Sequence, residues 1–120
     1  VTQLNRRVNT IERHKPLLDE AEGRCKKLRL HNITTRLGDG WLGWPEQAPF
    51  DRILVTAAAP DEPKALLSQL KPKGVLVAPI GKGPVQSLKR YTGDGAGGFK
   101  VEVMTDVRFV PLLDGVAKEL

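Results

Sequence analysis

The chain has 120 residues, of which 40% are hydrophobic and 28% charged, with a formal net charge of +5 and a single cysteine. This length excludes two independent cores, and because no apolar run approaches the ~20 residues that span a bilayer, no membrane partner is expected. Cys25 alone cannot form an intramolecular disulfide, and the Cys and His spacings of zinc sites are absent, so we expect a cytoplasmic setting and no metal.

The first third of the chain indicates a strand, a helix and a second strand. Residues 1–6 are typical of the last turns of a helix, and residues 8–11 form a short β-prone run. Pro16 suits the first turn of a helix, because its missing N–H is no loss there, and we expect this helix to end near residues 31–32. Residues 33–37 predict the second strand. The apolar stripe of the helix is formed by Leu17, Leu18, Ala21, Cys25 and Leu28.

The middle of the chain repeats this alternation. A loop rich in Trp, Pro and Gly at residues 41–49 precedes the most apolar strand candidate, residues 50–56, whose Ile-Leu-Val run is typical of a strand covered on both faces. Pro63 opens a further helix, residues 71–74 terminate it, and residues 75–80 predict a third buried strand. The buried stripe of this helix is formed by Leu66, Leu67 and Leu70.

The last part of the chain indicates a hairpin. Residues 86–91 and 99–110 are β-prone, and the glycine-rich residues 92–98 join them. Strands that alternate with helices and end in a hairpin predict an α/β fold with a mostly parallel sheet and an antiparallel C-terminal hairpin.

The positive charge is concentrated near the beginning of the chain. Residues 1–36 hold nine Lys or Arg against four Asp or Glu, whereas residues 37–120 hold ten of each kind. The solvated face of one amphipathic helix accounts for this surplus, and six aromatic residues are too few for a platform that stacks single strands. Nucleic acid is therefore not expected as a partner.

Two acidic residues follow the first and second predicted strands. Glu12 lies at the carboxyl end of the first strand, where ligands bind in doubly wound sheets and where an acid can accept both hydroxyls of a ribose; it could equally cap the next helix. Asp39 lies between Gly38 and Gly40, which would let the backbone approach a ligand closely, although a tight turn explains the same three residues.

Other residues are more ambiguous. Thr56 and Ala57 end the most buried strand with small side chains, which suits the floor under a reacting group but also close packing of a helix on a sheet. Trp41 and Trp44 could cover a pocket or anchor their loop. His14, His31 and Cys25 have no metal-ligand spacing, and Cys25 is expected in the core.

Six short motifs occur in one order over essentially the whole chain. Together they resemble the protein-L-isoaspartate O-methyltransferase family. These motifs are residues 10–13 (TIER), 38–41 (GDGW), 48–51 (APFD), 55–60 (VTAAAP), 69–72 (QLKP) with Gly74, and 108–112 (RFVPL).

This resemblance implies a Rossmann-like S-adenosylmethionine-dependent methyltransferase fold and no metal. The implied reaction transfers a methyl group from S-adenosylmethionine to the free carboxylate of L-isoaspartyl residues in damaged proteins. The implied enzyme is a monomer. By the resemblance, Glu12 binds the cofactor ribose, Asp39 and Gly40 contact the adenine, Thr56 and Ala57 border the reaction site, and Val110 lines the isoaspartyl pocket.

The chain also departs from the family pattern. The glycine-rich loop after the family's first, central strand is expected before Val1, as is a Ser/Thr-containing segment that positions the substrate carboxylate, and neither is present. We therefore expect residues 1–120 to be a single partial domain, corresponding to the C-terminal part of the family, whose sheet lacks its central strand and which is inactive alone.

Two other functions stay open. A methyltransferase of the same fold that acts on RNA or a small molecule would explain the basic first third but not the motif at residues 108–112. A non-catalytic binding module would use the basic helix to hold an acidic partner. The absence of an obvious general base suits methyl transfer, since displacement at a sulfonium by an ionised carboxylate needs alignment rather than proton transfer.

Overall fold

The computed structural model describes residues 6–113, 115 and 116, which fall into two compact units. The first unit comprises residues 1–40 and 114–120, and the second comprises residues 41–113. The expected end of a helix at residues 1–6 lies outside the described residues except for Arg6, which is in a bend. That residues 1–120 form a single domain stays a prediction.

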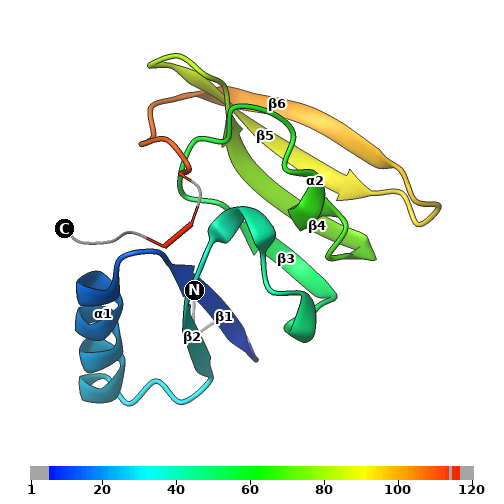
Figure 1. Ribbon diagram of the computed structural model, residues 1–120. Helices are drawn as coiled ribbons and strands as arrows, with labels where there is room; N and C mark the ends of the chain where they lie inside the picture. Colours follow the sequence, from blue (N-terminus) through cyan, green and yellow to red (C-terminus); the bar gives the residue numbers. More distant parts are fainter. Residues whose placement is uncertain (1–5, 114, 117–120) are drawn as a thin grey trace. The chain divides into compact units, whose positions relative to one another are not determined.

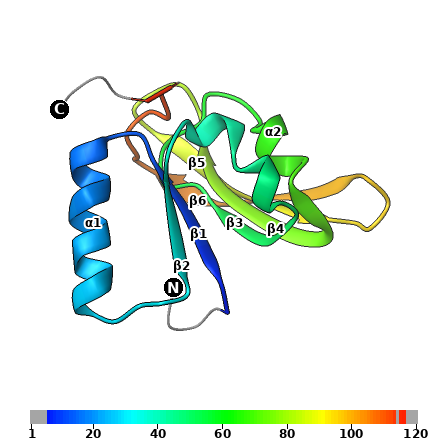
Figure 2. The same cartoon turned by 60° about the horizontal axis from the view of Figure 1, so that its bottom comes forward.

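The first unit is a βαβ arrangement, as expected. β1 (Val8–Glu12) and β2 (Ile33–Leu37) pair in parallel, and α1 (Lys15–Lys27) connects them and covers one face of the pair (Figures 1 and 2). The register places Glu12 opposite Leu37, so the carboxyl ends of both strands lie at one edge of the sheet.

Helix α1 is shorter and less buried than the sequence predicted. It ends at Lys27 because Arg29 adopts a left-handed backbone conformation with φ of 56°, while the N–H of Leu28 still bonds to the carbonyl of Arg24. Leu18 is its buried residue, whereas Leu17 and Leu28 are 44% and 69% exposed. The predicted five-residue buried stripe is therefore wrong, because a two-stranded sheet covers only a narrow strip of the helix.

The second unit contains a four-stranded sheet in the order β3-β4-β5-β6. Its strands are β3 (Phe50–Leu54), β4 (Leu70–Ile80), β5 (Gln86–Gly93) and β6 (Phe99–Val107). β3 and β4 pair in parallel, whereas β5 pairs with β4 and with β6 in an antiparallel direction. The antiparallel hairpin is thus confirmed, and the mostly parallel sheet that we expected is instead mixed.

Two further expectations for this unit are wrong. Residues 71–74 do not terminate a helix, because α2 (Lys64–Leu67) has a single turn and β4 already begins at Leu70, which pairs with Phe50. β3 is not covered on both faces, since Arg52 and Leu54, which lie on the same face of the strand, are exposed and Leu54 is 63% exposed.

The core of the second unit lies between α2 and the sheet. Leu76, Ala78 and Tyr91 face it from β4 and β5, and Leu66 and Leu67 face it from α2. Figure 1 shows α2 beside β4. Gln69, just after α2, anchors the loop that precedes β3. Its side chain accepts a hydrogen bond from the N–H of Trp44 at 2.9 Å and donates one to the carbonyl of Leu42 at 2.9 Å.

Candidate functional site

Glu12 ends β1 and holds the turn into α1. Its Oε1 accepts hydrogen bonds from the backbone N–H groups of Arg13 at 2.9 Å and His14 at 3.1 Å. His14, at the N-cap of α1, forms no side-chain cap hydrogen bond of its own. Glu12 therefore stabilises the turn, as one of its two interpretations required. Both bonds fall on the same oxygen, so Oε2 can accept from a ligand.

The segment at residues 38–40 begins beside Glu12. The N–H of Gly38 donates to the carbonyl of Glu12 at 3.0 Å, and Asp39 is half-buried. The structure therefore brings Glu12 and Asp39 to the same edge of the β1–β2 pair. Gly38 and Gly40 are not among the glycines with positive φ, so backbone conformation alone does not account for these two glycines.

In the second unit, the residues after β3 are held against the end of β4. The N–H of Val55 donates to the carbonyl of Val77 at 3.0 Å, and Ala59 bonds to Pro79 and Gly81 through its N–H and carbonyl, both at 2.8 Å. Thr56 and Ala57 lie between these anchored residues; Thr56 is exposed and Ala57 is half-buried. They are thus at the carboxyl ends of two parallel strands, where this class of fold binds ligands.

The segment at residues 109–112 lies along the same edge. The N–H of Ala58 donates to the carbonyl of Val110 at 2.6 Å, and the N–H of Leu112 donates to the carbonyl of Ala58 at 2.8 Å. The Trp41 indole N–H donates to the carbonyl of Leu112 at 3.1 Å, so Trp41 anchors its loop. The structure thus brings Val110, whose side chain is 71% exposed, next to Thr56 and Ala57.

The sequence analysis missed Gln86, which also belongs to this edge. It is 5% exposed, and its Oε1 accepts from the N–H of Phe109 at 2.8 Å. The sequence does place a glutamine at the start of a β-prone run. Since an unpaired amide is unfavourable in a buried strand, this glutamine could have been predicted to bind a backbone group.

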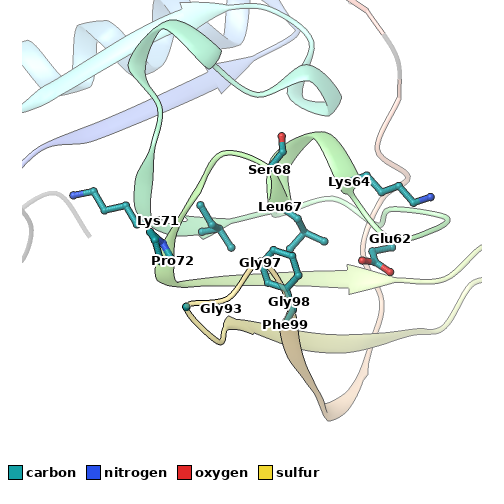
Figure 3. A pocket seen from close by; sticks show the side chains of 12 residues that line it. Glu62, Lys64, Leu67, Ser68, Lys71, Pro72, Gly93, Gly97, Gly98 and Phe99 are labelled. Carbon is teal, nitrogen blue, oxygen red and sulfur yellow. The ribbon is translucent and has the colours of Figure 1, made fainter.

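The second unit also contains a hollow of about 550 Å³ away from these residues. It lies at the amino end of β4, beside α2 and the turn between β5 and β6, and none of the expected site residues lines it. Figure 3 shows Lys64 and Lys71 extending outward on opposite sides, while Leu67 and Phe99 lie between them. Because its lysines diverge, the hollow offers no convergent charge for an anionic ligand.

One carboxylate near this hollow is already satisfied by its own turn. Asp94 accepts from the N–H groups of Ala96 at 2.7 Å and Gly98 at 3.0 Å, and these bonds hold the pKa of its carboxyl below the usual value. In the core, burial raises the pKa of the Tyr91 hydroxyl, and the charge of Glu62 adds to this effect. Neither group belongs to the edge that carries Thr56 and Val110.

Within the described part of the chain, no three His, Cys, Asp or Glu side chains gather in a way that could hold a metal ion. Among the same residues, no helix is both long and apolar enough to cross a membrane.

Comparison with known proteins gives a consistent family. A family model described as protein-L-isoaspartate(D-aspartate) O-methyltransferase matches residues 1–117. A protein-L-isoaspartate O-methyltransferase of Caulobacter sp. (strain K31) is 70% identical over 119 residues, which are 99% of this chain and 55% of that protein. One of Paramagnetospirillum magneticum is 56% identical over 121 residues, covering 99% of this chain and 56% of its own length. The chain spans about half the length of the curated relatives it matches.

Solved structures agree with the sequence comparison. A crystal structure described as a protein-L-isoaspartate O-methyltransferase of Plasmodium falciparum, in complex with S-adenosyl-L-homocysteine, superposes with a TM-score of 0.77 at 27% identity. The match covers 89% of this chain and 52% of that one. A second structure of a protein-L-isoaspartate O-methyltransferase, at 24% identity and the same TM-score of 0.77, supports the fold.

Proposed function

This chain belongs to the protein-L-isoaspartate(D-aspartate) O-methyltransferase family, and on that premise we propose that it serves in methyl transfer from S-adenosylmethionine to the free carboxylate of L-isoaspartyl residues in damaged proteins. The family match over residues 1–117 is the observation that carries this proposal. The edge formed by Thr56, Ala57 and Val110 agrees with it, because those three residues are the ones expected at the reaction site and the substrate pocket.

The cofactor is held, in this proposal, by residues of the first unit. Glu12 fits the ribose of S-adenosylmethionine, since one carboxylate oxygen is fixed by two backbone N–H groups and the other can accept from a hydroxyl. Asp39 and Gly40, which follow β2, contact the adenine. When bound, S-adenosylmethionine supplies a methyl group on a sulfonium centre.

The remaining residues orient the substrate. An isoaspartyl carboxylate is already ionised near neutral pH, so no residue of this chain has to remove a proton. Thr56 and Ala57 border the reacting groups, and Val110 forms an apolar wall of the isoaspartyl pocket. The backbone hydrogen bonds of Ala58 to Val110 and Leu112 keep Val110 beside Thr56 and Ala57. This arrangement provides the alignment that a direct displacement requires.

We also propose the state in which this activity operates. Residues 1–120 form a single partial domain of a Rossmann-like methyltransferase fold that lacks the family's first, central strand. In support, β1 pairs with β2 alone and β3 with β4 alone among the described residues, so each has an edge that could take another strand. The active protein is a cytoplasmic monomer whose partners are isoaspartyl peptides and proteins.

The test uses a protein of family length. Residues 1–120 are joined to the part of the Caulobacter sp. relative that this chain does not cover, which gives what we call the completed protein. It is incubated with labelled S-adenosylmethionine and a peptide that contains isoaspartate, and the control peptide contains ordinary aspartate at the same position. We expect methylation of the isoaspartyl peptide only. Methylation of RNA or a small molecule with no transfer to the peptide would refute the proposed function.

A further inference from the structure

Two glutamines are the buried polar side chains of the described residues. Gln69 is 7% exposed and Gln86 is 5% exposed, and each uses both ends of its amide to bond a loop backbone. A buried amide is unfavourable unless it is fully hydrogen-bonded, so each loop and its glutamine depend on one another.

Gln86 meets the chain just after β6 ends. It is the first residue of β5 and pairs with Val107, the last residue of β6. Its Oε1 accepts from the N–H of Phe109 at 2.8 Å, and its Nε2 donates to the carbonyl of Gly83 at 2.8 Å and lies 3.5 Å from the carbonyl of Phe109. The side-chain amide therefore continues the pairing of β5 with the chain beyond the end of the strand.

Gly81 fixes the position of this glutamine from the other side. A Cβ atom at Gly81 would lie 3.2 Å from the Cα of Gln86 and 3.3 Å from its Cβ and Cγ. The stem of Gln86 therefore lies directly against a backbone that has no side chain. Gly81 itself bonds through its N–H to the carbonyl of Ala59 at 2.8 Å, next to the border of the reaction site.

The segment that Gln86 holds has apolar contacts on either side of Val110 but little at Val110 itself. Leu112 packs against the core cluster and Phe109 is 39% exposed, whereas Val110 is 71% exposed, so the hydrophobic effect contributes little to the position of Val110. Hydrogen bonds fix the backbone along the segment: Gln86 at Phe109, Ala58 at Val110 and Trp41 at Leu112. Of these contacts, only the one from Gln86 acts on the residue immediately before Val110.

We infer that Gln86 is a positioning residue for substrate recognition, because it sets the place of Val110 by fixing the backbone of Phe109. This inference rests on the proposed function, in which Val110 forms a wall of the isoaspartyl pocket. Gln86 does not touch the substrate or the cofactor; it acts through Phe109.

The test compares two matched variants of the completed protein. Gln86→Met and Gln69→Met each replace a buried amide by an unbranched apolar side chain of similar length. The measurements are the KM and kcat for an isoaspartyl peptide at saturating S-adenosylmethionine, the Kd for S-adenosylhomocysteine, and the Tm. A merely structural role would lower the Tm in both variants and leave the KM for the peptide alike in both.

We expect Gln86→Met to raise the KM for the peptide about tenfold, because the Phe109 N–H loses its partner and Val110 is no longer held in place beside the substrate. Its Kd for S-adenosylhomocysteine should stay within about twofold of the parent value. Gln69 instead holds Leu42 and Trp44, and this loop meets the substrate segment only at Leu112, through Trp41. Gln69→Met should therefore raise the KM for the peptide less than Gln86→Met does.

A second variant covers the case in which Gln86→Met does not fold. Gly81→Ala keeps the amide, but because Gly81 has a φ of 153° the new side chain strains the backbone and also pushes the stem of Gln86 by a few tenths of an ångström, so a smaller rise in the KM for the peptide is expected. An unchanged KM in both Gln86→Met and Gly81→Ala, or a KM that rises equally in Gln69→Met, would overturn the inference. A parent that binds S-adenosylhomocysteine but never methylates the peptide would overturn the proposed function itself, and with it this role of Gln86.

Discussion

Glu12 has a role in the turn and a proposed role in binding, and substitution can separate them because they use different carboxylate oxygens. Oε1 bonds the N–H groups of Arg13 and His14, whereas Oε2 is the proposed acceptor for the ribose. Glu12→Ala removes both oxygens, so we expect the free energy of unfolding to fall by about 1 kcal/mol, as for the loss of a helix cap. Its affinity for S-adenosylhomocysteine should fall by about 1–3 kcal/mol, since a charge-assisted hydrogen bond is lost.

Glu12→Gln isolates the binding role. The amide oxygen of glutamine can replace Oε1 toward the two N–H groups, so the stability should stay within about 0.5 kcal/mol of the parent. The amide nitrogen cannot accept from a hydroxyl, so the affinity for S-adenosylhomocysteine should fall by about 1–2 kcal/mol, or about 5- to 30-fold.

Calorimetric titration with S-adenosylhomocysteine and thermal unfolding of the completed protein measure these two effects. Glu20→Gln is the control, because it removes the same charge from an exposed position of α1 and should leave the affinity within about twofold. If Glu12→Ala is destabilised while both Glu12 variants bind S-adenosylhomocysteine like the parent, Glu12 is only a cap and the ribose assignment is wrong.

Three further predictions concern the substrate, the extent of the chain and its charge pairs. In the completed protein, Val110→Asp should lower kcat/KM for the isoaspartyl peptide at least about tenfold, because the new carboxylate repels that of the substrate. The affinity for S-adenosylhomocysteine and the Tm should change little, because Val110 is 71% exposed. Normal peptide activity of this variant would exclude Val110 from the pocket. Residues 1–120 alone should show no methyl transfer in the labelled assay, and turnover comparable to the completed protein would contradict this. The hydrogen bond from Arg90 to Glu102, at 2.7 Å, holds the pKa of that carboxyl below its ordinary value of 4.5. Its stabilisation is therefore present above pH 4.5 and lost as the pH falls through the lowered pKa, so the Tm difference between the parent and Glu102→Gln should shrink at acid pH; a constant difference would show that the pair does not stabilise the hairpin.

Local sequence patterns predicted most elements because each depends on neighbours in the chain. The β-prone runs at residues 33–37 and 86–91 became β2 and the greater part of β5, and Pro16 lies in the first turn of α1. The glycine-rich residues between β5 and β6 form a turn in which Gly95 and Gly97 have positive φ. Such turns and periodicities are local, so no knowledge of packing was needed.

Burial could not be predicted in the same way, because it depends on what covers an element. Leu54 and Leu28 sit in apolar patterns that favour burial, yet they are 63% and 69% exposed. Leu54 lies with Arg52 on an exposed face of β3, and Leu28 follows a helix that packs on two strands in the described part of the chain. Residues 71–74, with Pro72 and Gly74, resemble a helix terminator, but they lie within β4, because Leu70 pairs with Phe50 before them and Val75 pairs with Arg52 after them, with an irregular register between.

By itself, the sequence determined the α/β class, the closing hairpin and the family, because these depend on the periodicity of apolar residues and on short motifs in a set order. It also identified Glu12 and Asp39 as acids that follow neighbouring strands. Only the tertiary structure decided that Ala58 bonds Val110, more than fifty positions away, and that the side chain of Gln86 holds Phe109. The first contact joins two backbone groups, which every residue carries, and in the second the amide of Gln86 meets a backbone N–H, so the residue types at Ala58, Val110 and Phe109 do not indicate these partners.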